Sequence, residues 1–120
     1  MAKPAKTRNG GQWTTARFRS FITSALRRAS GRWGPKNRAK QLARVARNTY
    51  RCAACQKLYG NSQVHIDHIA PVVDPVRGFV SWDEFIARLF VEVEGFRCLC
   101  ESCHAEVTAQ QREVRKANKR

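Results

Sequence analysis

An acid and an imidazole stand next to each other at Asp67-His68, near the middle of the chain. A carboxylate is a ligand that hard divalent cations prefer, and an imidazole titrates near neutral pH, so it can serve as a general base. The apolar alternation over residues 64–69 predicts a β-strand that delivers this pair and ends near Pro71. Such a pair is by itself more often a surface feature than a site, so its meaning depends on its surroundings.

Two Cys-x-x-Cys pairs flank the Asp-His pair, Cys52 with Cys55 before it and Cys100 with Cys103 after it. Tetrahedral zinc is satisfied by four thiolates, and each Cys-x-x-Cys turn supplies two of them. A redox pair or a merely buried set is the alternative, but two matched pairs in a reducing compartment favour structural zinc. The fifth cysteine, Cys98, alternates along a strand and is expected to be a small buried apolar residue outside the metal site.

A zinc ion bound to both pairs would join the two turns, and the second turn is followed at once by His104. We therefore expect His104 to face Asp67 across a cleft, where an acid and an imidazole bracket a divalent ion and adjacent His68 stays free as a base. His65 lies two residues before Asp67, on the same face of the strand, and is expected to be an exposed neighbour.

With these features the chain resembles the HNH nucleases, particularly the small free-standing ones of phages. The resemblance covers about residues 50–108 and lies in Cys52, Cys55 and the runs 64–75, 78–86 and 99–104. It implies an α+β fold with a ββα-metal hairpin and helix. It also implies that Asp67 and His104 coordinate a catalytic Mg²⁺ or Mn²⁺, that His68 is the general base, and that structural zinc sits on Cys52, Cys55, Cys100 and Cys103.

One position departs from the family pattern, because Gly95 stands where the family has an asparagine that braces the loop carrying the catalytic histidine. Glycine has no side chain to form that brace. The departure predicts a looser loop and a slower enzyme, unless Asn61 or another group takes over the role.

The remaining pattern predicts four helices around the hairpin. The first runs from Thr14 or Thr15 to a stop at Gly31, and the second begins at Gly34-Pro35. Ser81 with Glu84 forms a capping box ahead of a short helix over 82–91. A second strand over 96–99 and a final helix from Glu101 complete the expected order. The predicted divisions are a disordered basic arm at 1–12, a basic helical DNA-binding extension at 13–49, the nuclease domain at 50–110 and a basic tail at 111–120.

Charge indicates a polyanionic partner. The chain has 23 Lys and Arg against 9 Asp and Glu, a formal net charge of +14, and no acid precedes Asp67. Nucleic acid is favoured over a membrane, since no apolar run is long enough to span one. No secretory signal follows the basic N-terminus, so a cytoplasmic location is expected, that of the host cell if the protein is phage-encoded. The candidate DNA-binding residues are Arg17, Arg27, Arg28, Lys36, Lys40, Arg44, Arg47 and Arg97.

The function expected from the resemblance is a metal-dependent endonuclease that nicks or cuts double-stranded DNA, with phage packaging or replication proteins as further partners. The alternative is a catalytically silent, zinc-stabilised DNA-binding protein. An RNA-binding zinc protein ranks last, because it gives no reason for an Asp-His pair ahead of the second cysteine pair. Neither the target sequence nor the oligomeric state follows from any pattern in the chain.

Overall fold

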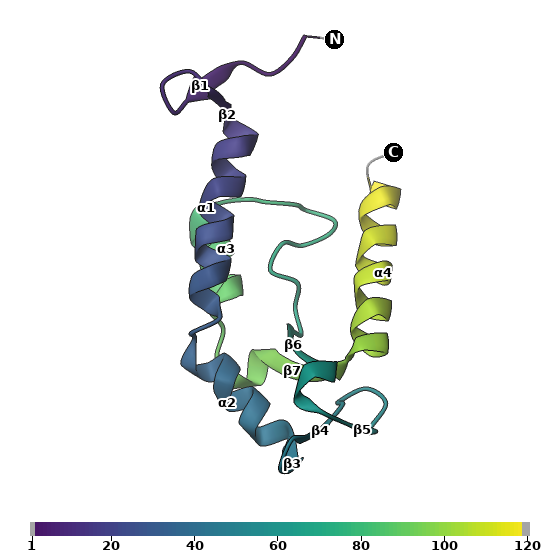
Figure 1. Ribbon diagram of the computed structural model, residues 1–120. Helices are drawn as coiled ribbons and strands as arrows, with labels where there is room; N and C mark the ends of the chain where they lie inside the picture. The colour runs from purple at the N-terminus through teal and green to yellow at the C-terminus, as the bar shows by residue number, and fades with distance from the viewer. Residues whose placement is uncertain (1, 119–120) are drawn as a thin grey trace. The chain divides into compact units, whose positions relative to one another are not determined.

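The computed structural model describes residues 2–118 and combines α-helices with small antiparallel sheets, which confirms the mixed α+β class (Figure 1). The chain divides into two compact units, Met1–Gly31 and Arg32–Arg120. None of the helices within 2–118 has the length and apolar character needed to cross a membrane.

The first unit is a hairpin followed by a helix. Strand β1 (Lys6–Arg8) pairs with β2 (Trp13–Thr14) across a turn in which Asn9, Gly10 and Gly11 all have positive φ. Helix α1 (Thr15–Ser30) begins as expected, with the Thr14 hydroxyl accepting a hydrogen bond from the backbone N–H of Arg17 at 3.1 Å. The arm predicted to be disordered therefore contains a strand, because the Asn-Gly-Gly run reverses the chain and lets it pair with itself.

The second unit begins with helix α2 (Gly34–Ala43), which has proline in its first turn as the sequence indicates. Strands β3 (Arg44–Ala46), β4 (Thr49–Arg51) and β5 (Leu58–Tyr59) follow as a three-stranded antiparallel sheet. Asn48, with φ of 51°, forms the turn between the first two strands. The unit boundary thus lies at Gly31, and α2 belongs with the cysteine-containing part of the chain rather than with a separate extension reaching residue 49.

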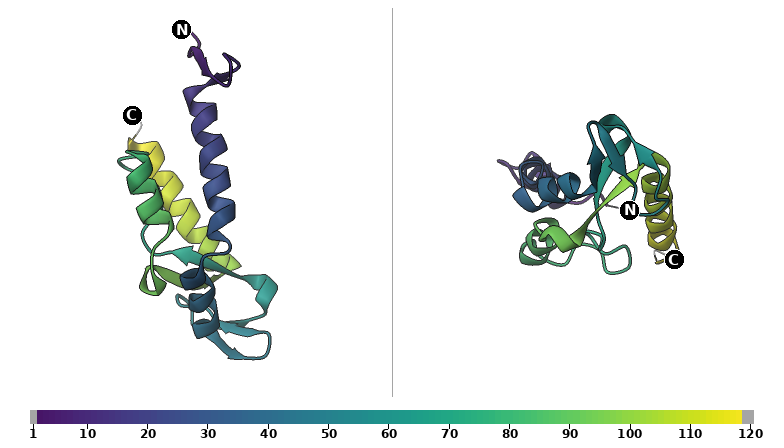
Figure 2. Two further views of the ribbon diagram at one scale, coloured as in Figure 1. Left: turned by 90° about the vertical axis from the view of Figure 1, so that its left-hand side faces the viewer. Right: turned by 90° about the horizontal axis from the view of Figure 1, so that it is seen from below.

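A two-stranded antiparallel hairpin carries the Asp-His pair. It consists of β6 (Val64–His68), preceded by the 3₁₀ turn η1 (Asn61–Gln63), and β7 (Phe96–Cys100), preceded by η2 (Val93–Gly95). Both strands were expected, although β6 ends at His68 rather than near Pro71. Helix α3 (Trp82–Leu89) lies in the long connection between them, and α4 (Glu101–Asn118) follows β7 directly (Figure 2). The expected basic tail is therefore helical to Asn118, and its last two residues lie outside the described part.

The register of the hairpin decides which side chains share a face. His65 pairs with Leu99 and Asp67 with Arg97 on one face, whereas His68 pairs with Phe96 on the other. Leu99 is fully buried in a cluster against which Val107 of α4 packs, and His104 of α4 stacks on His65, so α4 covers the first of these faces.

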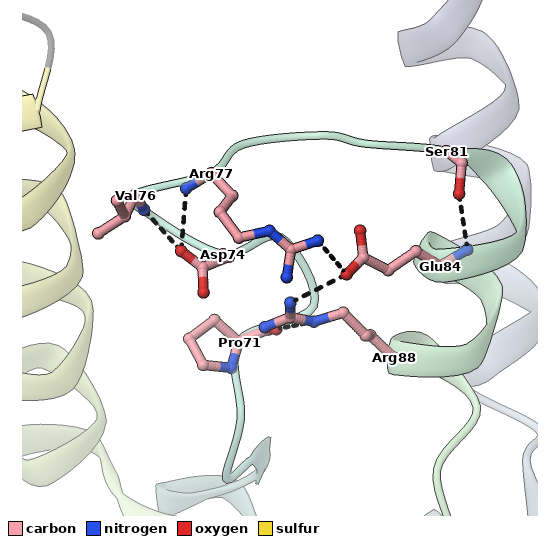
Figure 3. Close-up of polar contacts among 7 residues, drawn as sticks. All are labelled: Pro71, Asp74, Val76, Arg77, Ser81, Glu84 and Arg88. Carbon is pink, nitrogen blue, oxygen red and sulfur yellow. Dashed lines mark hydrogen bonds and ion pairs between the residues drawn. The ribbon is translucent and has the colours of Figure 1, made fainter.

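The connection after the hairpin's first strand is braced at α3 (Figure 3). The Arg77 guanidinium lies 2.6 Å from a carboxylate oxygen of Glu84, and Arg88 donates to the carbonyl of Pro71 at 2.8 Å. The Ser81 hydroxyl accepts from the Glu84 N–H at 3.1 Å, which confirms the N-cap half of the predicted capping box, whereas the Glu84 carboxylate pairs with Arg77 and Arg88; the helix ends at Leu89. These contacts tie the segment that follows the Asp-His pair to α3.

One carboxylate in this connection folds its own turn. Asp74 Oδ1 accepts from the backbone N–H groups of Val76 and Arg77 at 2.8 and 3.0 Å. The hydrogen bonds from Arg77 and Val76 lower the pKa of Asp74, because they favour its charged form. The turn closes with an isolated bridge between Asp74 and Gly78, whose φ is +71°.

Candidate metal centre and catalytic residues

The four cysteines of the two Cys-x-x-Cys pairs form one cluster. Their sulfur atoms all lie within 4.8 Å of one another, and those of Cys55 and Cys100 are 3.9 Å apart. Zn–S bonds of about 2.3 Å in a tetrahedron place sulfurs about 3.8 Å apart, so this spacing suits zinc. The predicted four-cysteine set, Cys52, Cys55, Cys100 and Cys103, can therefore hold a metal ion such as zinc.

The four thiols differ in acidity. Burial raises the pKa of Cys52, but hydrogen bonds from the backbone of Cys55, Cys100 and Ala54 outweigh it and bring the value down to about 6. The hydrogen bond to the Cys100 sulfur and burial raise the pKa of Cys103 to about 12. One buried sulfur is thus a thiolate at neutral pH and can take the first bond to a metal ion.

Backbone hydrogen bonds fix the first cysteine turn against the hairpin. The N–H of Ala53 donates to the carbonyl of Cys98 at 2.8 Å, and the N–H of Cys52 donates to the carbonyl of Lys57 at 3.0 Å. Gln56 closes the turn with φ of 65°. Cys98 itself is buried and lies outside the cluster, as predicted, and burial raises the pKa of its thiol.

His104, in the first turn of α4, lies against His65 rather than against Asp67. The two imidazole rings stack with centroids 4.7 Å apart and an interplanar angle of 25°. His65 is exposed, as expected, but its contact with His104 was not foreseen. Strand alternation puts His65 and Asp67 on one face but does not say which of the two His104 reaches, so no sequence signal specified this contact.

Asp67 carries a buried carboxylate oxygen, Oδ2, that makes no hydrogen bond but forms an ion pair. Its side chain is 19% exposed and lies 3.6 Å from the Arg97 guanidinium. Within residues 2–118, the buried Oδ2 of Asp67 and the buried Nε of Arg97 have no hydrogen-bond partner. Buried polar atoms are nearly always satisfied, so an orphaned carboxylate oxygen marks a position where a cation fits. Arg97, a candidate DNA contact, instead lies opposite Asp67 on the neighbouring strand.

His68 is held by the C-terminal end of α3. Its Nε2 lies 2.8 Å from the carbonyl oxygen of Leu89, and its ring contacts that of Phe96 at 4.8 Å between centroids. A carbonyl oxygen only accepts, so Nε2 carries the hydrogen, and the lone pair of the neutral ring is on Nδ1. Nδ1 of His68 is therefore the ring nitrogen that can take up a proton.

Gly95 braces this region through its backbone. Its carbonyl accepts from the N–H of Ile69 at 2.9 Å, directly after His68. A Cβ at position 95 would lie 2.5 Å from Cγ2 of Val91, so the close approach leaves no room for a side chain. Asn61 cannot replace the family's asparagine, because it precedes the start of β6, about 16 Å of strand from His68.

The predicted catalytic residues are only partly brought together. Asp67 and His104 belong to the same side of the hairpin, whereas strand alternation directs His68 to the other. In the part of the chain that the structure describes, the cysteine cluster is the one group of three or more Cys, His, Asp or Glu side chains close enough to share an ion.

Comparisons with protein-family models, curated proteins and solved structures gave no match. The chemistry of the site therefore rests on the chain's own residues.

The candidate DNA-binding residues occupy both units. Arg17, Arg27 and Arg28 are exposed on α1, and the Arg17 guanidinium lies 4.9 Å from the centre of the Trp13 ring. In the second unit, Lys36 and Lys40 lie on α2, whereas Arg44 and Arg47 lie in and after β3.

Proposed function

We propose that the protein is a metal-dependent endonuclease of the HNH type that hydrolyses phosphodiester bonds of double-stranded DNA. In this proposal β6, β7 and α4 form the ββα-metal core. The observation that carries it is the orphaned, buried Oδ2 of Asp67, next in the chain to a histidine whose Nε2–H is bound by the Leu89 carbonyl. A buried carboxylate oxygen that makes no hydrogen bond and pairs with one exchangeable cation, beside an oriented imidazole, gives the pair of groups that metal-assisted hydrolysis requires.

Asp67 and His104 would hold the catalytic ion, which Mg²⁺ or Mn²⁺ suits because a carboxylate, an imidazole and waters are ligands of hard or borderline cations. When bound, the ion supplies charge stabilisation on the phosphate and the leaving 3′ oxygen. The ion pair of Asp67 with Arg97 involves a partly exposed guanidinium, and such pairs are weak enough to be exchanged for a metal.

His68 would act through Nδ1. It takes a proton from water while the water oxygen bonds to phosphorus and the bond from phosphorus to the 3′ oxygen breaks. The Leu89 carbonyl holds the opposite nitrogen, and the Phe96 ring limits rotation, so the imidazole is oriented before substrate arrives. Zinc on the four cysteines would have no part in the chemistry and would fix α4, and with it His104, to the hairpin.

DNA is the proposed substrate because of the charge distribution. Residues 1–66 contain fifteen Lys or Arg and no acid, so none of these cations has an acidic neighbour within that segment. Such cations neutralise the phosphates of DNA, so the affinity for DNA should fall as the salt concentration rises.

A catalytically silent zinc-stabilised DNA-binding protein is the second candidate, favoured by the placement of His68 on the face opposite Asp67 and by the pairing of Asp67 with Arg97. It predicts salt-sensitive DNA binding that survives Asp67→Asn and no cleavage with any divalent ion.

Supercoiled plasmid incubated with Mg²⁺ or Mn²⁺ separates the two candidates. The wild-type protein should nick it, whereas His68→Ala and Asp67→Asn should lose at least about a hundredfold in rate, since general-base catalysis contributes about 10²–10⁴. Asp83→Asn, at an exposed carboxylate in the first turn of α3, is the matched control and should nick normally. Nicking that is absent at every protein concentration, or equal in wild type and His68→Ala, would remove the nuclease proposal.

A further inference from the structure

A polar hollow lies where α2 meets the three-stranded sheet, away from the Asp-His pair. Its lining consists of amides, cations and one aromatic ring: Asn37, Lys40, Gln41, Arg44, Tyr50 and Asn61. The hollow is open to solvent and offers about 570 Å³, which is within the size range of sites for small organic ligands. It contains no acidic residue.

Three of the six lining residues lie on one side of α2, and Arg44 follows them at the start of β3. Lys40 and Gln41 lie three and four positions after Asn37, so helical periodicity directs these three to the same side. Tyr50 enters from β4, and the Lys40 ammonium lies 5.4 Å from the centre of its ring. A cation and an aromatic surface are thus presented together.

The side-chain chemistry selects the ligand. Lys40 and Arg44 only donate, and they call for an anion such as a phosphate. The amides of Asn37, Gln41 and Asn61 offer acceptors as well as donors. An ionised phosphate has no hydrogen to give to these acceptors, whereas the edge of a nucleobase carries both donors and acceptors. A tyrosine ring offers a stacking surface that every base can use. A nucleotide is the unit that satisfies all three groups.

The concave shape distinguishes a paired from an unpaired nucleotide. In a duplex the bases are stacked and their Watson–Crick edges are paired, so a base cannot turn into a hollow on the protein. An unpaired nucleotide can turn its base toward the protein and be read by amides and a ring. Resting on the proposed DNA substrate, we propose that this hollow binds one unpaired nucleotide of DNA, so that the protein prefers duplexes that carry a single-stranded segment.

The proposal is tested by binding without any added Mg²⁺ or Mn²⁺, so that no cleavage interferes. Zinc-loaded protein is titrated at one salt concentration into a labelled duplex with a single-stranded overhang. The comparison duplex carries an overhang of equal length that has the same phosphates but no bases. The wild type should bind the base-carrying overhang on the order of tenfold more tightly.

The matched variants carry no change of charge. The double variant Asn37→Ala, Gln41→Ala changes two exposed positions to the best helix former, and it should lose most of the discrimination. Gln110→Ala, at an exposed position of α4, is the control and should keep it. Equal wild-type binding of both overhangs, or discrimination that persists in the double variant, would overturn the proposal.

Two further arms separate this proposal from the proposed function. Tighter binding of an RNA overhang than of the DNA overhang would overturn the assignment to DNA. Plasmid nicking without discrimination between the overhangs would overturn the nucleotide site alone, whereas discrimination without nicking would refute only the nuclease.

Discussion

Restoring a side chain at position 95 should destabilise the protein, even when that side chain is the asparagine of the family pattern. A Cβ built on Gly95 lies 2.5 Å from Cγ2 and 2.8 Å from Cβ of Val91. Carbon atoms rest at about 3.5–4.0 Å, so Val91 would have to retreat by about 1 Å. Overpacking of this kind costs about 1–3 kcal/mol.

Thermal and urea unfolding of zinc-loaded Gly95→Ala and Gly95→Asn should show this loss. A cost of about 1–3 kcal/mol corresponds to a fall in Tm of roughly 4–20 °C for a unit of this size. Val91→Ala removes the atom at 2.5 Å but leaves the one at 2.8 Å, so it should rescue Gly95→Ala in part, with a coupling free energy of about 1 kcal/mol.

The matched control is Gly60→Ala. A Cβ there meets its nearest atoms at 3.6 Å, an ordinary contact distance, and Gly60 has a negative φ of −75°. Its stability should stay within about 0.5 kcal/mol of the wild type. A Gly95→Ala protein as stable as wild type would refute the close approach to Val91. Faster plasmid nicking by Gly95→Asn would show that the side-chain brace is missing after all.

Three further predictions concern the metal sites. Cys55→Ser, or removal of zinc by a chelator, should lower the Tm of the cysteine-containing unit followed by circular dichroism, because structural zinc contributes folding free energy; Cys98→Ser should keep its zinc stoichiometry, since that thiol lies outside the cluster. The pKa of Cys52 is lowered from 9.0 to about 6, so its contribution to the stability of the metal-free protein is fully present above about pH 9 and is lost as pH falls through 6. Urea unfolding across pH 5–9 would detect this loss. A free energy of unfolding that is independent of pH over that range contradicts the prediction. Arg97→Gln removes the cation that pairs with Asp67, so Mn²⁺ binding measured by electron paramagnetic resonance should tighten. The gain should be up to about fivefold, which is what a partly exposed ion pair contributes. Weaker Mn²⁺ binding would refute the idea that Arg97 and Mn²⁺ compete for Asp67.

The elements that the sequence predicts well are those with local, periodic signals. The N-cap at Ser81, the proline start of α2 and the alternation of β6 are all read from neighbours a few residues apart, and each is confirmed. The four-cysteine cluster was equally predictable, because zinc chemistry leaves few other uses for two matched Cys-x-x-Cys pairs. Asn9-Gly10-Gly11 was misread as disorder, although its turn chemistry was visible in the sequence.

Contacts between distant residues were beyond the sequence. The stacking of His104 on His65 depends on how far α4 advances along the hairpin, and the tight contact of Gly95 with Val91 depends on the path of the chain after α3. Neither leaves a periodic signal. The expected pairing of His104 with Asp67 rested on zinc joining the two cysteine turns and on the family resemblance, which give the order of the ligands but not their position along the strand.

The register of the hairpin explains why His104 lies against His65. Cys100, at the zinc end of β7, pairs with Val64 at the start of β6, so a helix that begins after Cys100 lies over the first residues of β6. The Asp-His pair lies at the opposite end, opposite Arg97 and Phe96, where the packing of Gly95 and the Leu89 carbonyl define the structure. Two independent constraints therefore act on the proposed site. Loss of zinc should displace His104 first, whereas a side chain at position 95 should displace His68 first.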